Sequence, residues 1–225
     1  MTIKKKAILI GSGNSVQKGL NQDLWNQIKG EDIWSLNFCY RFMPYLPTKQ
    51  IWADTNVWEK CKDSLLMLHQ YGVELHARNY GGYEDYPQVK LHNVEDEKHQ
   101  LLPFTDDKGL EWDSIFIGRC GFVGLFALSL ACAMKYDEIF LLGYDFGTVD
   151  QTVFDTHWYQ EMDRGINAGS YGRTSIYLQG DKPRPEIEDF EYYLKSKTKI
   201  FNVSDISRID YFTKLTYEEF FEKLK

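Results

Sequence analysis

The chain has 225 residues, with 26 Lys and Arg against 33 Asp and Glu, so its formal charge is −7. This length suits one sizeable domain, or one domain with an insertion, whose core needs neither disulfides nor a structural metal. The acidic balance argues against bulk nucleic-acid binding, because such binding relies on Lys and Arg to neutralise phosphates. Aromatic residues make up 16% of the chain, which excludes the composition of an extended disordered protein.

The cysteine pattern and the N-terminus indicate the cellular compartment. Four cysteines are scattered without a Cys-x-x-Cys pair, and only a short apolar run precedes the first glycine-rich loop. We therefore expect a reduced, cytoplasmic protein without a signal peptide. The longest apolar stretch, residues 121–134, is too short to span a bilayer, so no membrane span is expected. A homo-oligomer remains open.

Strand-like and helix-like segments alternate along the chain. A short apolar run at 7–10 is followed by the glycine-rich residues 11–15 and then by Leu20, Leu24 and Ile28 at helical spacing, with Asn21 placed to cap the second part of that helix. Further strands are predicted at 33–36, 50–53, 73–77, 114–117, 138–142, 175–178 and 199–203, and further helices at 56–71, 121–136 and 217–224. This alternation predicts an α/β fold: a Rossmann-like, doubly wound, mainly parallel sheet that binds ligands at the carboxyl ends of its strands.

Two segments interrupt the alternation. Residues 80–111 are rich in Gly, Asp, Glu, His and Pro and predict an irregular surface excursion. Residues 148–173 are polar and aromatic and directly follow a strand end, and loops of this length are usually functional or disordered. We therefore predict a single α/β domain formed by residues 1–147 and 174–225, with residues 148–173 as a lid-like insertion.

The first candidate site is the loop Gly11, Ser12, Gly13, Asn14 and Ser15, between a strand and a helix. Two glycines allow a tight turn in which amide groups face an anion, and the Ser and Asn side chains add donors. The loop lacks the Gly-Lys-Ser/Thr of a Walker motif and the third glycine of the dinucleotide motif. A phosphate-binding loop and a plain tight turn are both compatible with this pattern.

A second candidate follows the strand at 138–142, where Gly143, Tyr144, Asp145 and Phe146 stand at the carboxyl end. Asp145 could accept a hydrogen bond from a sugar or base, and either aromatic ring could stack on a ligand. The alternative is a turn aspartate beside core aromatics.

The apolar helix before that strand starts with small residues that resemble another anion-facing helix N-terminus. Arg119 and Gly121 precede it, and Arg119 could supply a positive charge there. A surface arginine paired with an acid is the alternative interpretation.

His157 is the most suggestive of the five histidines because Asp155 and Tyr159 flank it in the polar loop after a strand end. Histidine is the usual general base near neutral pH, although a plain surface histidine fits as well. The chain has no His-x-x-x-His, paired-Cys or Asp-x-Asp metal pattern, so no metal ligands are assigned.

In their order, these motifs resemble a known group of proteins. Residues 11–15, Asn37 after the strand at 33–36, the helix that starts near Gly121, the segment 138–146 and the segment 201–207 (FNVSDIS) carry the resemblance. They are similar to the bacterial sialyltransferases of the Campylobacter lipooligosaccharide type (glycosyltransferase family 42) and to the related DUF115 and MptE-like group. The resemblance extends over nearly the whole chain.

The resemblance implies a nucleotide-binding domain and a transferase, most simply a glycosyltransferase that moves a sugar from a CMP-sugar-like donor to an acceptor hydroxyl. It implies His157 as the base, with Tyr159 and Asp145 as further catalytic candidates. Taken together with the residues singled out above, the candidate donor-binding residues are Gly11, Ser12, Gly13, Asn14, Ser15, Asn37, Asp54, Arg119, Gly121, Gly143, Tyr144 and Phe146. No cofactor is required, and the acceptor is not specified.

Other functions remain open. The opening loop lacks the proline usual in that group, and His157 follows Asp145 more closely than the sialyltransferase base does. The MptE-like relatives transfer diphosphate from ATP, a reaction that would bring Mg²⁺ as a cofactor. A non-catalytic module that senses a nucleotide or metabolite is the third alternative, since fold does not determine function.

Overall fold

The structure is a computed structural model that describes residues 4–79, 81–92, 101–105, 111–116, 122–146, 157–159, 178–179, 182–183, 189–191, 193–194 and 196–225. In these residues an eight-stranded, all-parallel sheet has the order β12-β11-β8-β1-β2-β3-β4-β5. Its strands are β1 (Lys6–Ile10), β2 (Ile33–Leu36), β3 (Lys49–Trp52), β4 (Glu74–Arg78), β5 (Val89–His92), β8 (Glu138–Leu142), β11 (Lys199–Asn202) and β12 (Thr213–Lys214). The predicted Rossmann-like α/β fold is confirmed.

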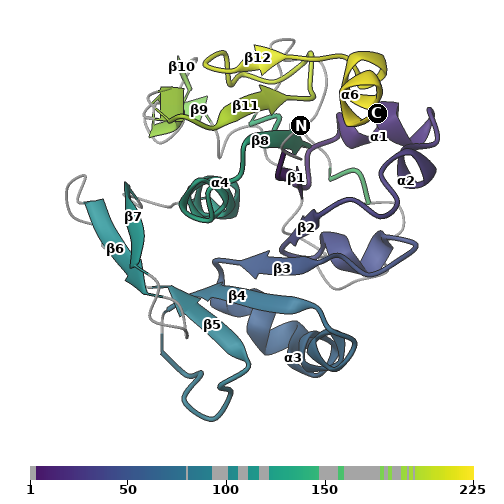
Figure 1. Cartoon of the computed structure of the whole chain (residues 1–225). Helices are drawn as coiled ribbons and strands as arrows, with labels where there is room; N and C mark the ends of the chain where they lie inside the picture. The colour runs from purple at the N-terminus through teal and green to yellow at the C-terminus, as the bar shows by residue number, and fades with distance from the viewer. Residues whose placement is uncertain are drawn as a thin grey trace.

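The strand order reverses between β1 and β8. From β1 the chain builds the sheet outward through β2, β3, β4 and β5, and then returns to pair β8 with the other side of β1 (Figure 1). In open α/β sheets the crevice outside the carboxyl ends of the strands at such a reversal is the usual ligand-binding position. The loops that follow β1 and β8 both carry candidate site residues.

Helices cover both faces of the sheet (Figure 1). One face carries α1 (Val16–Leu20), α2 (Leu24–Gln27), α3 (Thr55–Gln70), α6 (Tyr217–Leu224) and the short 3₁₀ helix η1 (Cys39–Phe42), and the other carries α4 (Val123–Ala133). Successive strand residues point to opposite faces: Ile8 and Ile10 pack toward α1, whereas Ala7 and Leu9 pack toward α4. Apolar side chains on both faces of β1 account for its continuous hydrophobic run.

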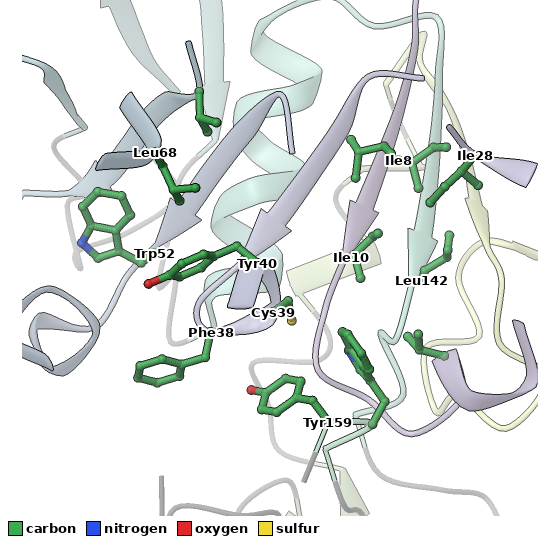
Figure 2. Close-up of a cluster of buried hydrophobic side chains, with 14 of the residues drawn as sticks. Ile8, Ile10, Ile28, Phe38, Cys39, Tyr40, Trp52, Leu68, Leu142 and Tyr159 are labelled. Atoms are coloured by element: carbon green, nitrogen blue, oxygen red, sulfur yellow. The ribbon is translucent and has the colours of Figure 1, made fainter. Parts of the chain in front are cut away.

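The core on the α1 face reaches the carboxyl edge of the sheet. Figure 2 shows Ile8 and Ile10 along β1, with Cys39 and Tyr159 beyond the end of the strand. Tyr159 is 1% exposed. Through Trp158 and Tyr159, this core therefore joins the segment at 157–159 to the rest of the domain.

Two predicted helices have the expected character. Nearly every side chain of α4 is buried, as its all-round apolar sequence predicts. Helix α6 begins at Tyr217 after a capping box in which Thr216 and Glu219 exchange hydrogen bonds. None of the helices in the described part of the chain is both long and apolar enough to cross a membrane.

Some predicted elements differ from the structure. The irregular excursion predicted at 80–111 contains β5, which lies at the edge of the main sheet, and also a strand at 101–105, so that prediction was wrong for residues 89–92 and 101–105. The strand predicted at 114–117 lies in β7 (Glu111–Phe116), which pairs antiparallel with β6 (Leu101–Thr105) outside the main sheet. A second small pair joins β9 (Leu178–Gln179) and β10 (Lys182–Pro183).

The helix predicted around Leu20 and Leu24 is divided in two. Asn21 ends α1 and is not the cap of a second helix. Asp23, which has a positive φ of 60°, immediately precedes α2. A residue in the left-handed region interrupts a right-handed helix, so the apolar spacing continues while the helix does not.

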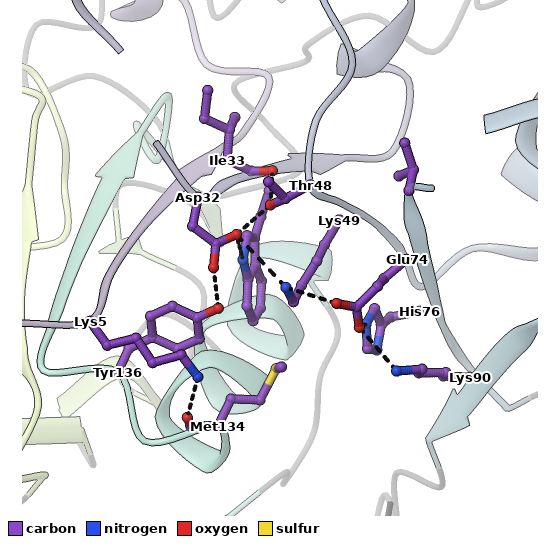
Figure 3. Close-up of polar contacts among 12 residues, drawn as sticks. Lys5, Asp32, Ile33, Thr48, Lys49, Glu74, His76, Lys90, Met134 and Tyr136 are labelled. Carbon is purple, nitrogen blue, oxygen red and sulfur yellow. Dashed lines mark hydrogen bonds and ion pairs between the residues drawn. The ribbon is translucent and has the colours of Figure 1, made fainter. Parts of the chain in front are cut away.

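A charged network lies at the amino ends of the strands, opposite the carboxyl edge of the sheet (Figure 3). The buried Lys49 ammonium is 3.7 Å from an Asp32 oxygen and 3.3 Å from a Glu74 oxygen. Glu74 also lies 3.4 Å from His76 Nε2 and 3.0 Å from the Lys90 ammonium. The charged partners come from β3, β4 and β5 and from Asp32 immediately before β2, so the network links the amino ends of neighbouring strands and is a structural element of the fold.

We expect the two neighbouring imidazoles of His76 and His92 to make the protein sensitive to acid. Their Nδ1 and Nε2 atoms are 3.0 Å apart. Burial, followed by the charges of His76 and Lys90, lowers the pKa of His92 to about 3. Since the unfolded chain takes up this proton near pH 6.5, stability is retained above that pH and lost as the pH falls toward 3.

The His92→Gln variant tests this expectation, because it removes the titration. Urea unfolding at a series of pH values should show a shallower loss of stability below pH 6.5 than in the wild type. An identical pH slope in both proteins would contradict the assignment.

Candidate functional site

The glycine-rich loop after β1 is bonded to the end of β8 by alternate amides. Gly11 N–H donates to Leu142 O at 2.8 Å, and Gly13 N–H donates to Gly143 O at 2.9 Å. Ser15 N–H donates to the Asp145 carboxylate at 2.8 Å. The two loops predicted separately from sequence are therefore one structural unit at the point where the strand order reverses.

Glycine is required where these loops meet. A Cβ on Gly13 would lie 2.6 Å from both Gly143 O and the Asp145 carboxylate. Gly143 has a φ of +69°, and a Cβ on it would lie 2.7 Å from Gly11 O. The backbones approach each other too closely for any side chain.

Gly13→Ala should therefore lower the free energy of unfolding by about 1–3 kcal/mol, the usual cost of overpacking. Gly30→Ala is a suitable control, because Gly30 has nothing within 4 Å of an added Cβ and a φ of +93°, so only the cost of that conformation, about 1 kcal/mol, applies. The midpoints of urea unfolding give the comparison. Equal destabilisation in both variants would show that the contact with β8 is unimportant.

The Asp145 side chain holds the two loops together by hydrogen bonds. Its side chain accepts hydrogen bonds from Ser15 N–H at 2.8 Å, Ser15 Oγ at 2.5 Å and Ser204 Oγ at 2.9 Å. The residue is 3% exposed. Burial raises its pKa above the ordinary value, and the Ser15 and Ser204 donors oppose that rise. Both carboxylate oxygens are thus occupied by the protein's own donors.

The segment after β11 supports the same unit, a role that the sequence did not reveal. Ser207 Oγ donates to Tyr144 O at 2.6 Å and accepts from Asn202 Nδ2 at 2.9 Å. Together with Ser204, these residues belong to the motif at 201–207 on which the resemblance partly rests. Their positions explain the small hydroxyl side chains of the motif. From the strand beside β8, the Ser204 and Ser207 hydroxyls donate hydrogen bonds to the Asp145 carboxylate and the Tyr144 carbonyl, just after the end of β8.

Two loop amides are available for a ligand. Among the described residues, the backbone N–H groups of Ser12 and Asn14 donate to no acceptor. Both residues are partly exposed, whereas Gly11 and Ser15 on either side are buried. The amides of residues 11, 13 and 15 therefore bind acceptors within the protein. The amides of residues 12 and 14, which alternate with them along the loop, can bind an external acceptor.

Asn37 and Asp54 form a neighbouring polar group at the ends of β2 and β3. Asn37 has a φ of 50°, and its Oδ1 atom is buried without a hydrogen-bond partner among the residues that the structure describes. Desolvation raises the pKa of Asp54, opposed by a hydrogen bond from the Asn37 side chain and by the charge of Arg78. Arg78, at the end of β4, was not singled out from the sequence, because a single arginine inside a strand pattern carries no motif.

The aromatic candidates lie mainly in the core. Tyr144 is 1% exposed and donates to Gly124 O at 3.1 Å. Phe146 is partly exposed, with a φ of 47°, and contacts Phe122 edge-on. Tyr159 stacks on Phe42 with ring centroids 4.6 Å apart. Of these three rings, Phe146 is the one with an accessible part.

His157 is partly exposed, and its ring stacks on that of Tyr159 with centroids 5.3 Å apart. The next residue, Trp158, hydrogen-bonds directly to the glycine-rich loop. The structure therefore brings the His157 segment to the same loop as the free amides. Arg119 and Gly121 lie outside the described residues, as does the insertion predicted at 148–173 apart from residues 157–159.

Within the described ranges, no group of three or more His, Cys, Asp and Glu side chains is arranged to hold a metal ion. The donors and acceptors at the carboxyl edge include backbone amides, hydroxyls and side-chain amides, together with the carboxylates of Asp54 and Asp145 and the guanidinium of Arg78. This set suits a polar organic ligand with an anionic group.

Comparisons with known proteins support the fold. No protein-family model matches the chain, and no curated protein matches it in sequence. Among solved structures it is similar to the MAf glycosyltransferase from Magnetospirillum magneticum AMB-1, with a TM-score of 0.54 and 14% identity. The match covers 97% of this chain and 34% of the other, so this chain spans about a third of that protein's length.

Proposed function

We propose that this protein is a glycosyltransferase that uses a nucleotide-activated sugar, with a CMP-sugar as the donor suggested by the sequence motifs. The observation that carries the proposal is that, within the described part of the chain, the N–H groups of Ser12 and Asn14 donate no hydrogen bond at the reversal of strand order between β1 and β8. Amides presented in this way bind phosphate oxygens. The structural neighbour is a glycosyltransferase with the same fold over nearly the whole of this chain.

The polar group beside the loop fits the other half of a nucleotide. Asn37 Oδ1 is a buried acceptor for which the described residues provide no donor, a state that costs free energy unless a ligand supplies the missing hydrogen bond. Ribose hydroxyls and the amino group of cytosine are such donors. We therefore assign the phosphate to the loop at 11–15 and the nucleoside to the ends of β2 and β3.

The reaction follows from these assignments. His157 takes the proton of the acceptor hydroxyl as its oxygen attacks the anomeric carbon of the sugar. The bond from that carbon to the phosphate oxygen breaks, and the electron pair leaves with the nucleotide. The loop amides stabilise the negative charge that develops on the departing phosphate. Because the loop amides and His157 lie at one edge of the sheet, they would align the sugar donor with the acceptor hydroxyl, and this alignment contributes to the rate.

A panel of nucleotides and nucleotide sugars tests the proposal. We expect CMP to raise the melting temperature and a CMP-sugar to be slowly hydrolysed, with water as the acceptor. A shift seen only with ATP and Mg²⁺ would indicate diphosphate transfer, and tight nucleotide binding without turnover toward any acceptor would indicate a sensing module. If no nucleotide shifts the melting temperature and no donor turns over, the proposal is wrong.

A further inference from the structure

Trp158 connects the His157 segment to the glycine-rich loop across 147 positions of sequence. Its indole Nε1–H donates to Gly11 O at 3.0 Å, and its backbone N–H donates to Ser12 O at 3.0 Å. Its own carbonyl accepts from Gln17 Nε2 at 2.5 Å. Trp158 therefore donates hydrogen bonds to two consecutive carbonyls of the loop.

The indole ring is held by packing on several sides. It lies against Trp25 of α2 with centroids 5.8 Å apart, and Phe42 and Tyr159 contact it edge-on. Trp158 is 2% exposed. A side chain that is buried and hydrogen-bonded in this way has one orientation, so it can fix the orientation of the groups it binds.

Peptide geometry passes this orientation to the ligand side of the loop. In a trans peptide the C=O of one residue points opposite to the N–H of the next. The Trp158 indole therefore fixes the Gly11 carbonyl and, through the same peptide plane, the free amide of Ser12. The next peptide is held at both ends, because Ser12 O accepts from Trp158 and Gly13 N–H donates to Gly143 O.

The same residue determines the place of His157. His157 and Tyr159 are its chain neighbours, and the Tyr159 ring stacks both on Phe42 and on His157. The Ser12 amide and the His157 imidazole are therefore tied to one rigid anchor. Acceptor deprotonation and phosphate stabilisation need a fixed distance between these groups, since small misplacements reduce rates strongly.

We propose that Trp158 is a positioning residue that sets the glycine-rich loop and His157 relative to each other for sugar transfer. This inference rests on the proposed function. Trp158 touches neither reacting atom. It acts through the Gly11 and Ser12 carbonyls on one side and through the backbone of His157 on the other.

The Trp158→Phe variant removes the indole N–H and leaves an aromatic ring. Trp34→Phe is the matched control, because Trp34 is also fully buried and donates one indole hydrogen bond, to Asp32 at 3.1 Å near the amino edge of the sheet. Losing the bond to Gly11 should lower kcat/KM for CMP-sugar hydrolysis about tenfold, with KM raised and kcat lowered together. Trp34→Phe should leave both constants within about twofold of the wild type.

Hydrogen exchange gives a readout that needs no ligand. The amides of Gly13 and Ser15, followed in a peptide spanning the loop, should exchange about fivefold or more faster in Trp158→Phe and unchanged in Trp34→Phe. Gln17→Ala removes the third hydrogen bond from the partly exposed surface of α1 and should change exchange and kcat/KM in the same direction by a smaller factor. If Trp158→Phe does not fold, the comparison of Gln17→Ala with the wild type tests the proposal in its place.

The outcomes separate the two proposals. Equal exchange rates in Trp158→Phe and Trp34→Phe overturn the inference, as does faster loop exchange with unchanged kcat and KM. A wild-type protein that neither binds nucleotide nor turns over a donor overturns the proposed function. In that case the exchange rates still decide whether Trp158 orders the loop.

Discussion

Replacing His157 with Ala should lower the turnover of a CMP-sugar donor by about 10²- to 10⁴-fold, the range typical of a lost general base. Nucleotide affinity should stay within about twofold of the wild type, because the imidazole acts on the acceptor hydroxyl and not on the nucleotide. Single-turnover kinetics with nucleotide binding measured by calorimetry separate the two effects. A loss confined to kcat is the expected signature of a base.

His69→Ala is the matched control for this experiment. His69 is an exposed histidine in the last turn of α3, so its removal should change neither turnover nor affinity. Similar kinetics in the two variants would contradict the role of His157 as the base. A loss of nucleotide affinity in His157→Ala alone would instead place the imidazole on the donor phosphate.

The parallel sheet could be predicted from the sequence because its two middle strands, β1 and β8, are buried on both faces and read as continuous apolar runs. Strand β8 and helix α6 were predicted at the residues where they occur. Strand β5 was missed because an edge strand needs few apolar residues: Val89 is buried, whereas Lys90 and Leu91 are exposed. Its polar flanks resemble a loop, and only its pairing with β4 makes it a strand.

The site could be predicted in its parts but not in its connections. Glycines mark the loops after β1 and β8, and Asp145 marks a strand end, so these segments were identified separately. That Asp145 binds Ser15 and Ser204 depends on the order of strands in the sheet, which local sequence does not encode. The contact of Trp158 with the glycine-rich loop likewise joins positions 147 residues apart, and only the folded chain brings them together.

The occupied oxygens of Asp145 give the largest expected effect on stability. Asp145→Ala leaves Ser15 N–H, Ser15 Oγ and Ser204 Oγ without their acceptor, and should lower the free energy of unfolding by about 3 kcal/mol or more. Asp205→Ala is the control from the same edge of the sheet. The Asp205 side chain is 61% exposed in its pair with Lys18, so its removal should cost less than about 1 kcal/mol in urea unfolding.

The Asp145→Asn variant distinguishes a structural role of the Asp145 side chain from a role of its charge in the reaction. The Asn oxygen can still accept from Ser15 N–H while its NH₂ group donates to a hydroxyl, so this variant should lose less than half as much stability as Asp145→Ala. Because burial raises the Asp145 pKa above 3.8, the native state holds this proton more tightly than the unfolded chain. Its contribution to stability therefore declines as the pH rises from 3.8 to the native pKa, a decline that Asn removes. If the charge of Asp145 takes part in the reaction, Asp145→Asn will abolish turnover while the protein stays stable. If the role of Asp145 is structural, the loss of turnover in Asp145→Ala and Asp145→Asn will follow the loss of stability in each.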